Sequence, residues 1–230
     1  MLPEINSLMK QTPAHDRHNP DLLRLMSKNL KRVVEVGCSS GALARAYIAE
    51  NPGCEYTGIE IDAEYAEQAK TFCSSVICAN VETMSESTFL SLFPSDCWVF
   101  GDSLEHLLDP WALLKRMRGH LQADARIIAC IPNAQHWSVQ ARLNCGAFRY
   151  EDQGLLDRTH LRWFTRITII ELFQSTGYHI VEGFSRVADE PARQNVLPSI
   201  RAMAVATGTD PQLAENDSLA VQYVVKVAPA

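Results

Sequence analysis

The chain has 230 residues, of which 47% are hydrophobic, and a formal net charge of −6. This length and composition predict a globular protein with a sizeable core and exclude a disordered chain. The charges are scattered and no basic stripe runs along the sequence, which argues against nucleic acid as a partner on electrostatic grounds. No apolar stretch approaches the length of a membrane span and the N-terminus lacks a signal-peptide pattern, so no membrane partner is expected.

The cysteine pattern indicates a reducing compartment. The seven cysteines are odd in number, contain no Cys-x-x-Cys pair, and several lie in apolar runs. We interpret them as reduced, mostly buried thiols of a cytoplasmic protein. Cys38 is the one expected nearest to a ligand.

Strands and helices alternate from residue 31 onward, after a polar segment that turns weakly helical and is interpreted as a lead-in helix within residues 1–30. The expected strands cover residues 32–36, 55–61, 75–79, 96–101 and 126–131. The expected helices between them cover residues 41–50, 63–72, 85–93 and 110–120. This alternation predicts an α/β fold, a parallel sheet with helices on both faces. Ligands then bind at the carboxyl ends of the strands.

Regularity is lost after Pro132. Residues 133–165 show few clean periods and are long for a connection, so we predict a functional insert after strand five that covers the acceptor. A helix over 167–176, a strand over 178–184, a loop-rich stretch over 188–216 and a final strand over 218–227 are expected to follow. Residues 1–230 are predicted to form a single domain.

The first strand–turn–helix unit carries the most informative pattern. Residues 33–41 read Val-Val-Glu-Val-Gly-Cys-Ser-Ser-Gly, and Glu60 ends the second strand about twenty residues later. Glycine lets the backbone approach a ligand closely, and an acid at the second strand end can accept hydrogen bonds from both ribose hydroxyls. Glu35 would repel a pyrophosphate but suits a cationic ligand, which argues against an NAD-type oxidoreductase.

This segment resembles motif I of class I S-adenosylmethionine (SAM) methyltransferases, E/D-x-G-x-G-x-G, with Ser39 in place of the middle glycine. The resemblance implies a Rossmann-like seven-stranded sheet in the order 3-2-1-4-5-7-6, with the last strand antiparallel, and SAM as cofactor. Asn80 and Val81 follow strand three, where the family contacts adenine, although Asn80 could instead cap a helix. The implied cofactor-binding residues are Glu35, Gly37, Cys38, Ser39, Gly41, Glu60, Ile61, Asn80, Val81, Asp102 and Ser103.

Strand four ends in Gly-Asp-Ser-Leu-Glu-His-Leu-Leu-Asp-Pro at 101–110. This stretch resembles the D-x-L-E-H-x-x-D-P segment of small-molecule methyltransferases, including the O-methyltransferases of ubiquinone biosynthesis. The resemblance implies that Asp102 lies beneath the methionine portion of SAM and that His106 faces the transferred methyl. A neutral imidazole there can remove a substrate proton. The alternative is that Glu105 and His106 only bond the loop and cap the next helix.

A metal site is a second interpretation of the same stretch. Asp102, Glu105 and His106 stand at i, i+3 and i+4, and His160 could add a second imidazole. The set resembles the E-x-x-E-H segment and later histidine of metal-dependent small-RNA 2′-O-methyltransferases. Here Asp replaces the first Glu and their RNA-binding domain is missing, so a polar network without a divalent metal ion is the expectation.

The acceptor is expected to meet two segments of the insert. Residues 154–165 read Gly-Leu-Leu-Asp-Arg-Thr-His-Leu-Arg-Trp-Phe-Thr, closely similar to a segment of bacterial methyltransferases found with polysaccharide and secondary-metabolite pathways. His160 is a candidate catalytic residue beside His106, and guanidinium groups suit an anionic or hydroxylated acceptor. A structural salt-bridge cluster is the alternative. The predicted acceptor-binding residues are Asn133, His136, Trp137, Arg158 and Arg162.

These patterns together favour a SAM-dependent methyltransferase that acts on a small molecule or saccharide. The family resemblance favours O-methylation. The alternatives are a metal-dependent enzyme like the 2′-O-methyltransferases and a catalytically silent methyltransferase-like subunit. The acceptor cannot be read from the sequence, and a homodimer stays open.

Overall fold

The computed structural model describes residues 16–230, so the start of the predicted lead-in segment lies outside the described residues. The strands are β1 (Arg32–Val36), β2 (Glu55–Glu60), β3 (Ser75–Cys78), β4 (Cys97–Gly101), β5 (Arg126–Pro132), β6 (Tyr178–Val187) and β7 (Ala220–Pro229). The α-helices are α1 (Pro20–Leu25), α2 (Ala42–Glu50), α3 (Ala63–Ala69), α4 (Glu86–Ser91), α5 (Pro110–Arg118), α6 (Trp137–Asn144), α7 (Arg166–Ser175), α8 (Leu197–Ala206) and α9 (Pro211–Leu219). Two 3₁₀ turns are η2 (Leu104–His106) and η3 (Pro191–Asn195).

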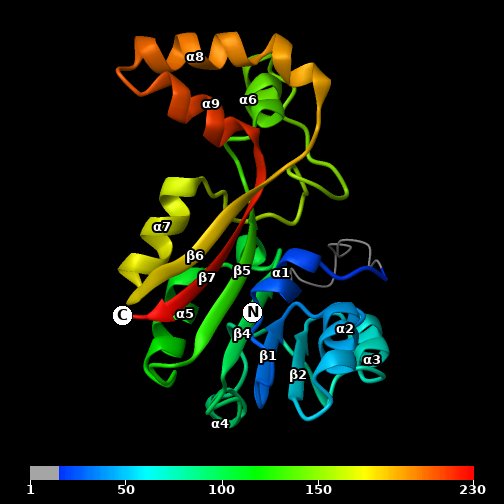
Figure 1. The fold of residues 1–230 in the computed structure, drawn as a ribbon. Helices are drawn as coiled ribbons and strands as arrows, with labels where there is room; N and C mark the ends of the chain where they lie inside the picture. Colours follow the sequence, from blue (N-terminus) through cyan, green and yellow to red (C-terminus); the bar gives the residue numbers. More distant parts are fainter. Residues whose placement is uncertain (1–15) are drawn as a thin grey trace, which may run out of the picture.

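The seven strands form one sheet in the order β3-β2-β1-β4-β5-β7-β6 (Figure 1). β1 pairs in parallel with β2 and β4, while β7 runs antiparallel between β5 and β6. The sheet order and the antiparallel last strand that the family resemblance implied are confirmed. Because the order reverses beside β1, the carboxyl ends of β1 and β4 flank the point where α/β sheets bind ligands.

Helices cover both faces of the sheet. On one face, α1, α2 and α3 contribute buried side chains such as Leu22, Leu43 and Ala69 to one apolar cluster. On the other face, α4, α5 and α7 contribute side chains such as Leu114 and Phe173 to a second cluster. All seven cysteines are free and five of them are buried, as the sequence predicts.

Local sequence explains where several helices begin. Asp109 accepts a hydrogen bond from the Ala112 backbone N–H at 3.0 Å, and Pro110 follows in the first turn, where its missing N–H is not needed. Thr165 caps α7, and Gly177 lies just beyond this helix with φ +89°. These caps place each helix directly after a strand end or a site loop.

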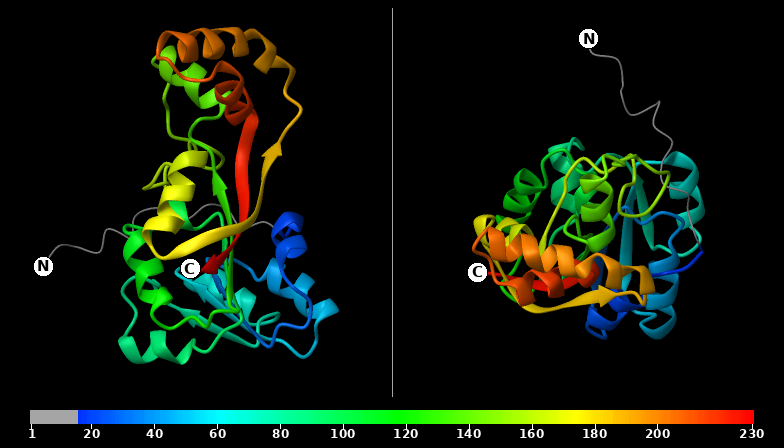
Figure 2. Two further views of the ribbon diagram at one scale, coloured as in Figure 1. Left: turned by 60° about the vertical axis from the view of Figure 1, so that its left-hand side comes forward. Right: turned by 90° about the horizontal axis from the view of Figure 1, so that it is seen from above.

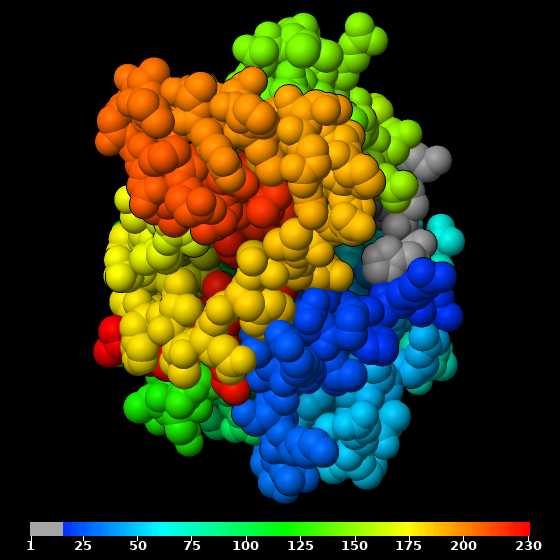
Figure 3. Space-filling model, turned by 45° about the horizontal axis from the view of Figure 1, so that its top comes forward, coloured from blue at the N-terminus to red at the C-terminus, as the bar shows by residue number. Residues whose placement is uncertain are grey.

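The connection between β6 and β7 was expected to be loop-rich, and that prediction is wrong. It contains η3, α8 and α9, which lie beside α6 beyond the end of the sheet (Figures 1 and 2). In the space-filling view, the orange residues of this connection lie next to the green segment that contains α6 (Figure 3). The prolines that suggested a loop, Pro191, Pro198 and Pro211, occupy first-turn positions of helices.

Residues 16–230 contain no helix with both the length and the apolar character that a membrane crossing requires.

Candidate functional site

A cavity of about 1210 Å³ opens at the carboxyl ends of the strands. Its lining includes the residues that end β1, β2, β3 and β4 and a segment of the insert. Ten of the eleven predicted cofactor-binding residues line it: Glu35, Gly37, Cys38, Ser39, Glu60, Ile61, Asn80, Val81, Asp102 and Ser103. Gly41 does not line it; with φ +82°, it lies at the end of the same turn, immediately before α2. The predicted catalytic residues His106 and His160 line the same cavity.

The turn after β1 needs its left-handed conformations. Gly37 has φ +74°, and a Cβ added there would lie 3.2 Å from the Cβ of Ser103. Ser39 departs from the usual glycine of this motif, yet it also adopts a positive φ of 47°. The backbone N–H of Gly37 donates to the Ile59 carbonyl at 2.8 Å, which joins the turn to the end of β2. The turn is therefore fixed and exposes its backbone to the cavity.

Glu60 is held by three backbone donors. Its carboxylate accepts hydrogen bonds from the N–H groups of Ser39 at 2.8 Å, Ile61 at 2.8 Å and Asp62 at 3.0 Å. A carboxylate offers about four lone-pair positions, so Oε2, with one donor, keeps capacity for a ligand hydroxyl. This arrangement fixes the acid between the turn and the end of β2, as ribose binding requires.

Glu35 is a buried carboxyl group beside the turn. The Tyr56 hydroxyl donates to its Oε2 at 2.9 Å. Burial raises the pKa of Glu35 well above its ordinary value; the Tyr56 hydrogen bond opposes this shift, and the charges of Cys73 and Glu60 add to it. A bound cation would favour the ionised form of this carboxyl group.

The end of β3 is joined to the loop after β4 by a contact that sequence reasoning did not identify. Asn80 Oδ1 accepts from the Glu82 N–H at 2.8 Å, consistent with the capping alternative. The Glu82 carboxylate accepts from the N–H groups of Leu108 at 2.9 Å and Asp109 at 2.7 Å. The Asn-Val-Glu run at residues 80–82 could be seen in the sequence, but it does not reveal the partners of Glu82, which lie in the loop after β4.

Asp102 begins the loop after β4 with φ +54° and accepts a hydrogen bond from the Gln222 side chain of β7. Gln222 also lines the cavity, and nothing in its local sequence indicates this role. Ser103 is buried, and its hydroxyl has no hydrogen-bond partner among the described residues. The Asp102 carboxylate and the Ser103 hydroxyl therefore both lie beside the glycine turn.

Glu105, His106 and His160 line the cavity and form a compact cluster there. Each offers one ligand-type atom, and these atoms lie within 4.8 Å of one another. The rings of His106 and His160 have centroids 4.8 Å apart, and His160 Nε2 lies 3.9 Å from Glu105 Oε1. Asp102, the fourth candidate metal ligand, does not belong to this group.

Both imidazoles in this cluster favour the neutral form. Burial lowers the pKa of His106, against the opposing effect of its hydrogen bond with the Thr159 backbone. Burial, followed by the neighbouring His106, lowers the pKa of His160 to about 4. Burial, followed by the charge of Asp102, raises the pKa of Glu105 well above its ordinary value. At neutral pH the two histidines can therefore accept a proton or bind a metal ion.

Two arginines that were predicted to bind the acceptor do not line the cavity. Arg158 is half-exposed and forms an ion pair with Asp152 at 2.6 Å. Arg162 donates to the backbone carbonyl of Leu108 and ties the insert to the loop after η2. This corrects their placement and favours the structural alternative, since the partner of a guanidinium group cannot be read from its neighbours in sequence. Residues 153–155, 157 and 159–161 of the insert do line the cavity.

The three predicted residues after β5 also lie away from the cavity lining. His136 caps α6, and its Nε2 lies 3.2 Å from Glu190 Oε2, which accepts a hydrogen bond from Trp137 Nε1 at 2.8 Å. Asn133 is fully buried and donates to the backbone carbonyls of Asp217 and Ala220 at 2.8 and 2.7 Å. These side chains join the insert to the β6–β7 connection rather than facing an acceptor.

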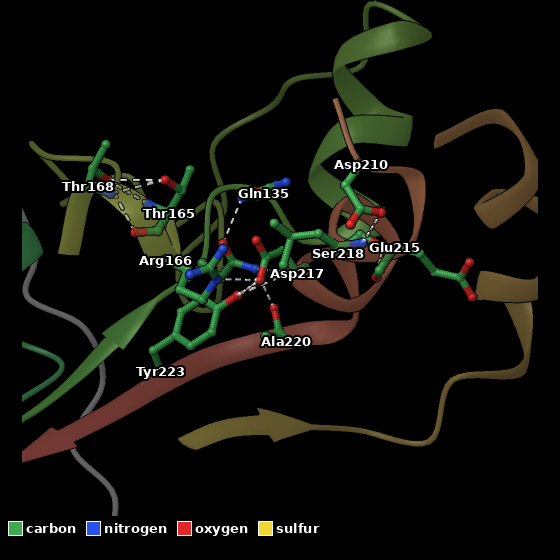
Figure 4. A network of polar contacts seen from close by, with 12 residues as sticks. Gln135, Thr165, Arg166, Thr168, Asp210, Glu215, Asp217, Ser218, Ala220 and Tyr223 are labelled. Carbon is green, nitrogen blue, oxygen red and sulfur yellow. Dashed lines mark hydrogen bonds and ion pairs between the residues drawn. The ribbon is translucent and has the colours of Figure 1, made fainter. Parts of the chain in front are cut away.

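The Asn133 contacts belong to a larger polar network. Figure 4 shows Arg166 and Tyr223 converging on Asp217, with Arg166 Nε 2.8 Å and the Tyr223 hydroxyl 3.3 Å from Asp217 Oδ1. The network holds α7, α9 and β7 together at the upper end of the sheet. It therefore fixes the end of β5 from which the insert leaves.

We expect Asn133→Ala to lower the free energy of unfolding by about 2 kcal/mol, because two buried carbonyl groups lose their donor. SAM affinity should stay at the wild-type level. Denaturant unfolding measures the change, with Gln135→Ala on the same loop as control. Unchanged stability in Asn133→Ala together with a specific loss of acceptor use would restore Asn133 as an acceptor-binding residue.

The sheet order and the arrangement of helices on its two faces define the Rossmann-like methyltransferase fold. A family model described as a methyltransferase domain matches residues 12–182, most of the chain. The protein belongs to this methyltransferase domain family. No curated protein matches the sequence.

Solved structures with the same fold include several methyltransferases. A putative S-adenosylmethionine-dependent methyltransferase from Listeria monocytogenes has a TM-score of 0.60 and 11% identity, over 92% of this chain and 97% of that chain. An O-methyltransferase from a trans-AT PKS multienzyme of Brevibacillus brevis, in complex with S-adenosyl-L-homocysteine, has a TM-score of 0.59 and 13% identity, over 92% and 71%. Mitomycin 7-O-methyltransferase has a TM-score of 0.57 and 12% identity, over 91% of this chain.

The chain spans about half of the mitomycin enzyme, since the match covers 52% of that chain. At such identities the likeness concerns the fold. The family and the fold point to SAM as the cofactor, in agreement with the sequence.

Proposed function

We propose that the protein binds SAM in the part of the cavity lined by Glu35, Gly37 and Glu60 and transfers its methyl group to an oxygen of a small hydroxylated molecule or saccharide. The choice of acceptor rests on the sequence resemblance and on the O-methyltransferases among the structures of similar fold. The residues proposed to act on the acceptor are His106 and His160.

One observation carries this proposal. A single cavity is lined both by the strand-end residues predicted to bind the cofactor and by the Glu105, His106 and His160 cluster. Sites for drug-sized ligands commonly measure about 300–1,000 Å³, so a volume of about 1210 Å³ leaves room for a cofactor and a small acceptor together.

The chemistry requires orientation and removal of one proton. The acceptor oxygen attacks the methyl carbon in line with the bond to sulfur; that bond breaks, and its electron pair stays on sulfur as a neutral thioether. Holding the two reactants in this geometry supplies much of the rate enhancement. His106 is proposed to accept the hydroxyl proton. Its Nδ1 lies 3.1 Å from the Thr159 carbonyl, so a proton on Nδ1 leaves Nε2 free to act as the base.

Two measurements test this function. Calorimetric titration with SAM and, separately, with NAD should show binding of SAM alone. Conversion of SAM to S-adenosylhomocysteine with a panel of hydroxylated metabolites and saccharides should then reveal turnover. Binding of NAD but not SAM would overturn the proposal, whereas SAM binding without turnover on any acceptor would favour the catalytically silent subunit.

We further expect SAM affinity to increase as the pH rises from 5.5 to 7.5. Glu35 has a raised pKa in the free protein, so a cationic ligand must displace its proton, and affinity can rise up to about tenfold per pH unit below that pKa. Tyr56, Cys38, Cys73 and Glu60 are titratable groups that interact with it. Calorimetry across this range should give a flat profile for Glu35→Gln. The same slope in this variant and the wild type would assign the dependence to another group.

A further inference from the structure

The Glu105 carboxylate is in an unusual position for an acidic side chain. It is fully buried, and neither of its oxygens has a hydrogen-bond partner among the described residues. Its backbone is well bonded by contrast, because its carbonyl accepts from the N–H groups of Leu161 and Arg162 at 2.8 and 2.9 Å. An unpartnered buried carboxyl group is costly in either protonation state, so a ligand that satisfies its oxygens would stabilise this position.

Two imidazoles lie near this carboxyl group, but neither forms a hydrogen bond with it. His160 Nε2 lies 3.9 Å from Glu105 Oε1, beyond hydrogen-bond length. The His106 ring is held by a backbone group, because its Nδ1 lies 3.1 Å from the Thr159 carbonyl. Such contacts orient histidines that bind metal ions and fix which ring nitrogen is available.

The spacing of the three groups suits one ion. Their ligand atoms lie within 4.8 Å of one another. Ligand atoms around an ion at about 2.1 Å lie about 3–3.5 Å apart, so closure around an ion requires movement of the order of 1 Å. His106 and His160 are on separate segments, after β4 and in the insert, and small side-chain rotations can provide this movement.

The ligand set also indicates the kind of ion and its role. Two imidazoles and one carboxylate suit a first-row divalent ion such as Zn²⁺ or Mn²⁺ better than Ca²⁺ or Mg²⁺, which prefer all-oxygen sites. All three side chains line the cavity, so further coordination positions face the space proposed for the acceptor. A site with three protein ligands and open positions is typical of catalytic rather than structural metal centres.

We propose that Glu105, His106 and His160 bind one first-row divalent metal ion, which supplies the partner that the buried Glu105 carboxyl group lacks and holds the acceptor oxygen beside the SAM methyl group. This inference rests on the proposed function for the role of the ion, but not for its binding. With the ion bound, His106 Nε2 is a ligand, and this replaces its role as a base, because Nδ1 is bonded to the Thr159 carbonyl. It departs from the expectation of a polar network without an ion, because the burial of an unpartnered Glu105 could not be seen in the sequence.

Cobalt(II) is a direct probe, because its visible absorption reports coordination without any need for turnover. Protein freed of metal with a chelator is titrated with Co²⁺. We expect one equivalent to bind with visible bands in the wild type, and affinity at least about tenfold weaker in Glu105→Gln and in His160→Ala. His179→Ala, which changes an exposed histidine on β6, is the matched control and should bind Co²⁺ like the wild type.

Circular dichroism and SAM titration on the same samples separate the possible failures. Folded variants that bind SAM normally but have lost the Co²⁺ bands support the metal site. Equal Co²⁺ affinity in the wild type, Glu105→Gln and His160→Ala would overturn it while leaving the methyltransferase proposal intact. Absence of SAM binding in the wild type would instead count against the proposed function, whatever the result with Co²⁺.

Discussion

Replacing Gly37 with valine should abolish SAM binding while the protein stays folded. Gly37 has φ +74°, and its added side chain would occupy the space between the turn and Ser103, whose Cβ lies 3.2 Å from the position of the new Cβ. The backbone strain costs about 1–3 kcal/mol, less than the stability of a typical domain. Calorimetric titration with SAM, beside circular dichroism, measures both parts of this expectation.

Gly146→Val is the matched control. Gly146 also has a positive φ, of 68°, but nothing lies within 4 Å of the Cβ position and the residue does not line the cavity. It therefore carries similar backbone strain without obstructing a ligand. Wild-type SAM affinity in a folded Gly37→Val variant, or equal losses in the two variants, would remove the assignment of the cofactor to this turn.

His106→Ala should lower turnover at least about a hundredfold while SAM affinity is nearly kept. The imidazole lies in the cluster proposed to meet the acceptor, and loss of a group that removes a proton typically costs about 10²–10⁴ in rate. Steady-state kinetics with the acceptor found by screening, together with SAM titration, separates the two effects. His179→Ala should retain wild-type kinetics.

Chelation distinguishes the two ways in which His106 could act. If it works as an ion ligand, exhaustive chelation should reduce wild-type turnover towards that of His106→Ala, and Mn²⁺ or Zn²⁺ should restore it. If it works as a base alone, chelation should leave the wild-type rate unchanged. A His106→Ala variant as active as the wild type would exclude both roles.

The cofactor side of the cavity could be predicted from the sequence because its signals are local. Glu35, Gly37 and Gly41 lie within seven positions, and Glu60 ends the next strand, so one strand–turn–helix–strand unit carries the whole pattern. The alternation of strands and helices likewise allowed the parallel part of the sheet to be predicted. The two helices between β6 and β7 were missed because prolines in the first turn of a helix look the same in sequence as prolines in a loop.

The acceptor side was harder to predict because its contacts join distant segments. The Asp102 carboxylate accepts a hydrogen bond from the Gln222 side chain, 120 positions away in the sequence. His106 is hydrogen-bonded to the backbone of Thr159, 53 positions away. Arg158 was predicted to bind an acceptor because it lies in the family-like segment at 154–165 and carries a guanidinium group, but its side chain forms an ion pair with Asp152 and does not line the cavity. That His106 and His160 lie close together could be inferred from the sequence only through family resemblance, whereas the burial of Glu105 beside them is a property of the fold.

The most direct test of SAM binding at this strand edge is hydrogen exchange with and without S-adenosylhomocysteine. With the ligand bound, we expect slower exchange in the turn at 37–41, at the end of β2 over 60–62, after β3 over 80–82, and in residues 153–161 of the insert. Exchange in α8 and α9, which lie away from the cavity lining, should not change. Equal exchange rates at 37–41 and 60–62 in both states, under conditions where the ligand is saturating, would contradict it.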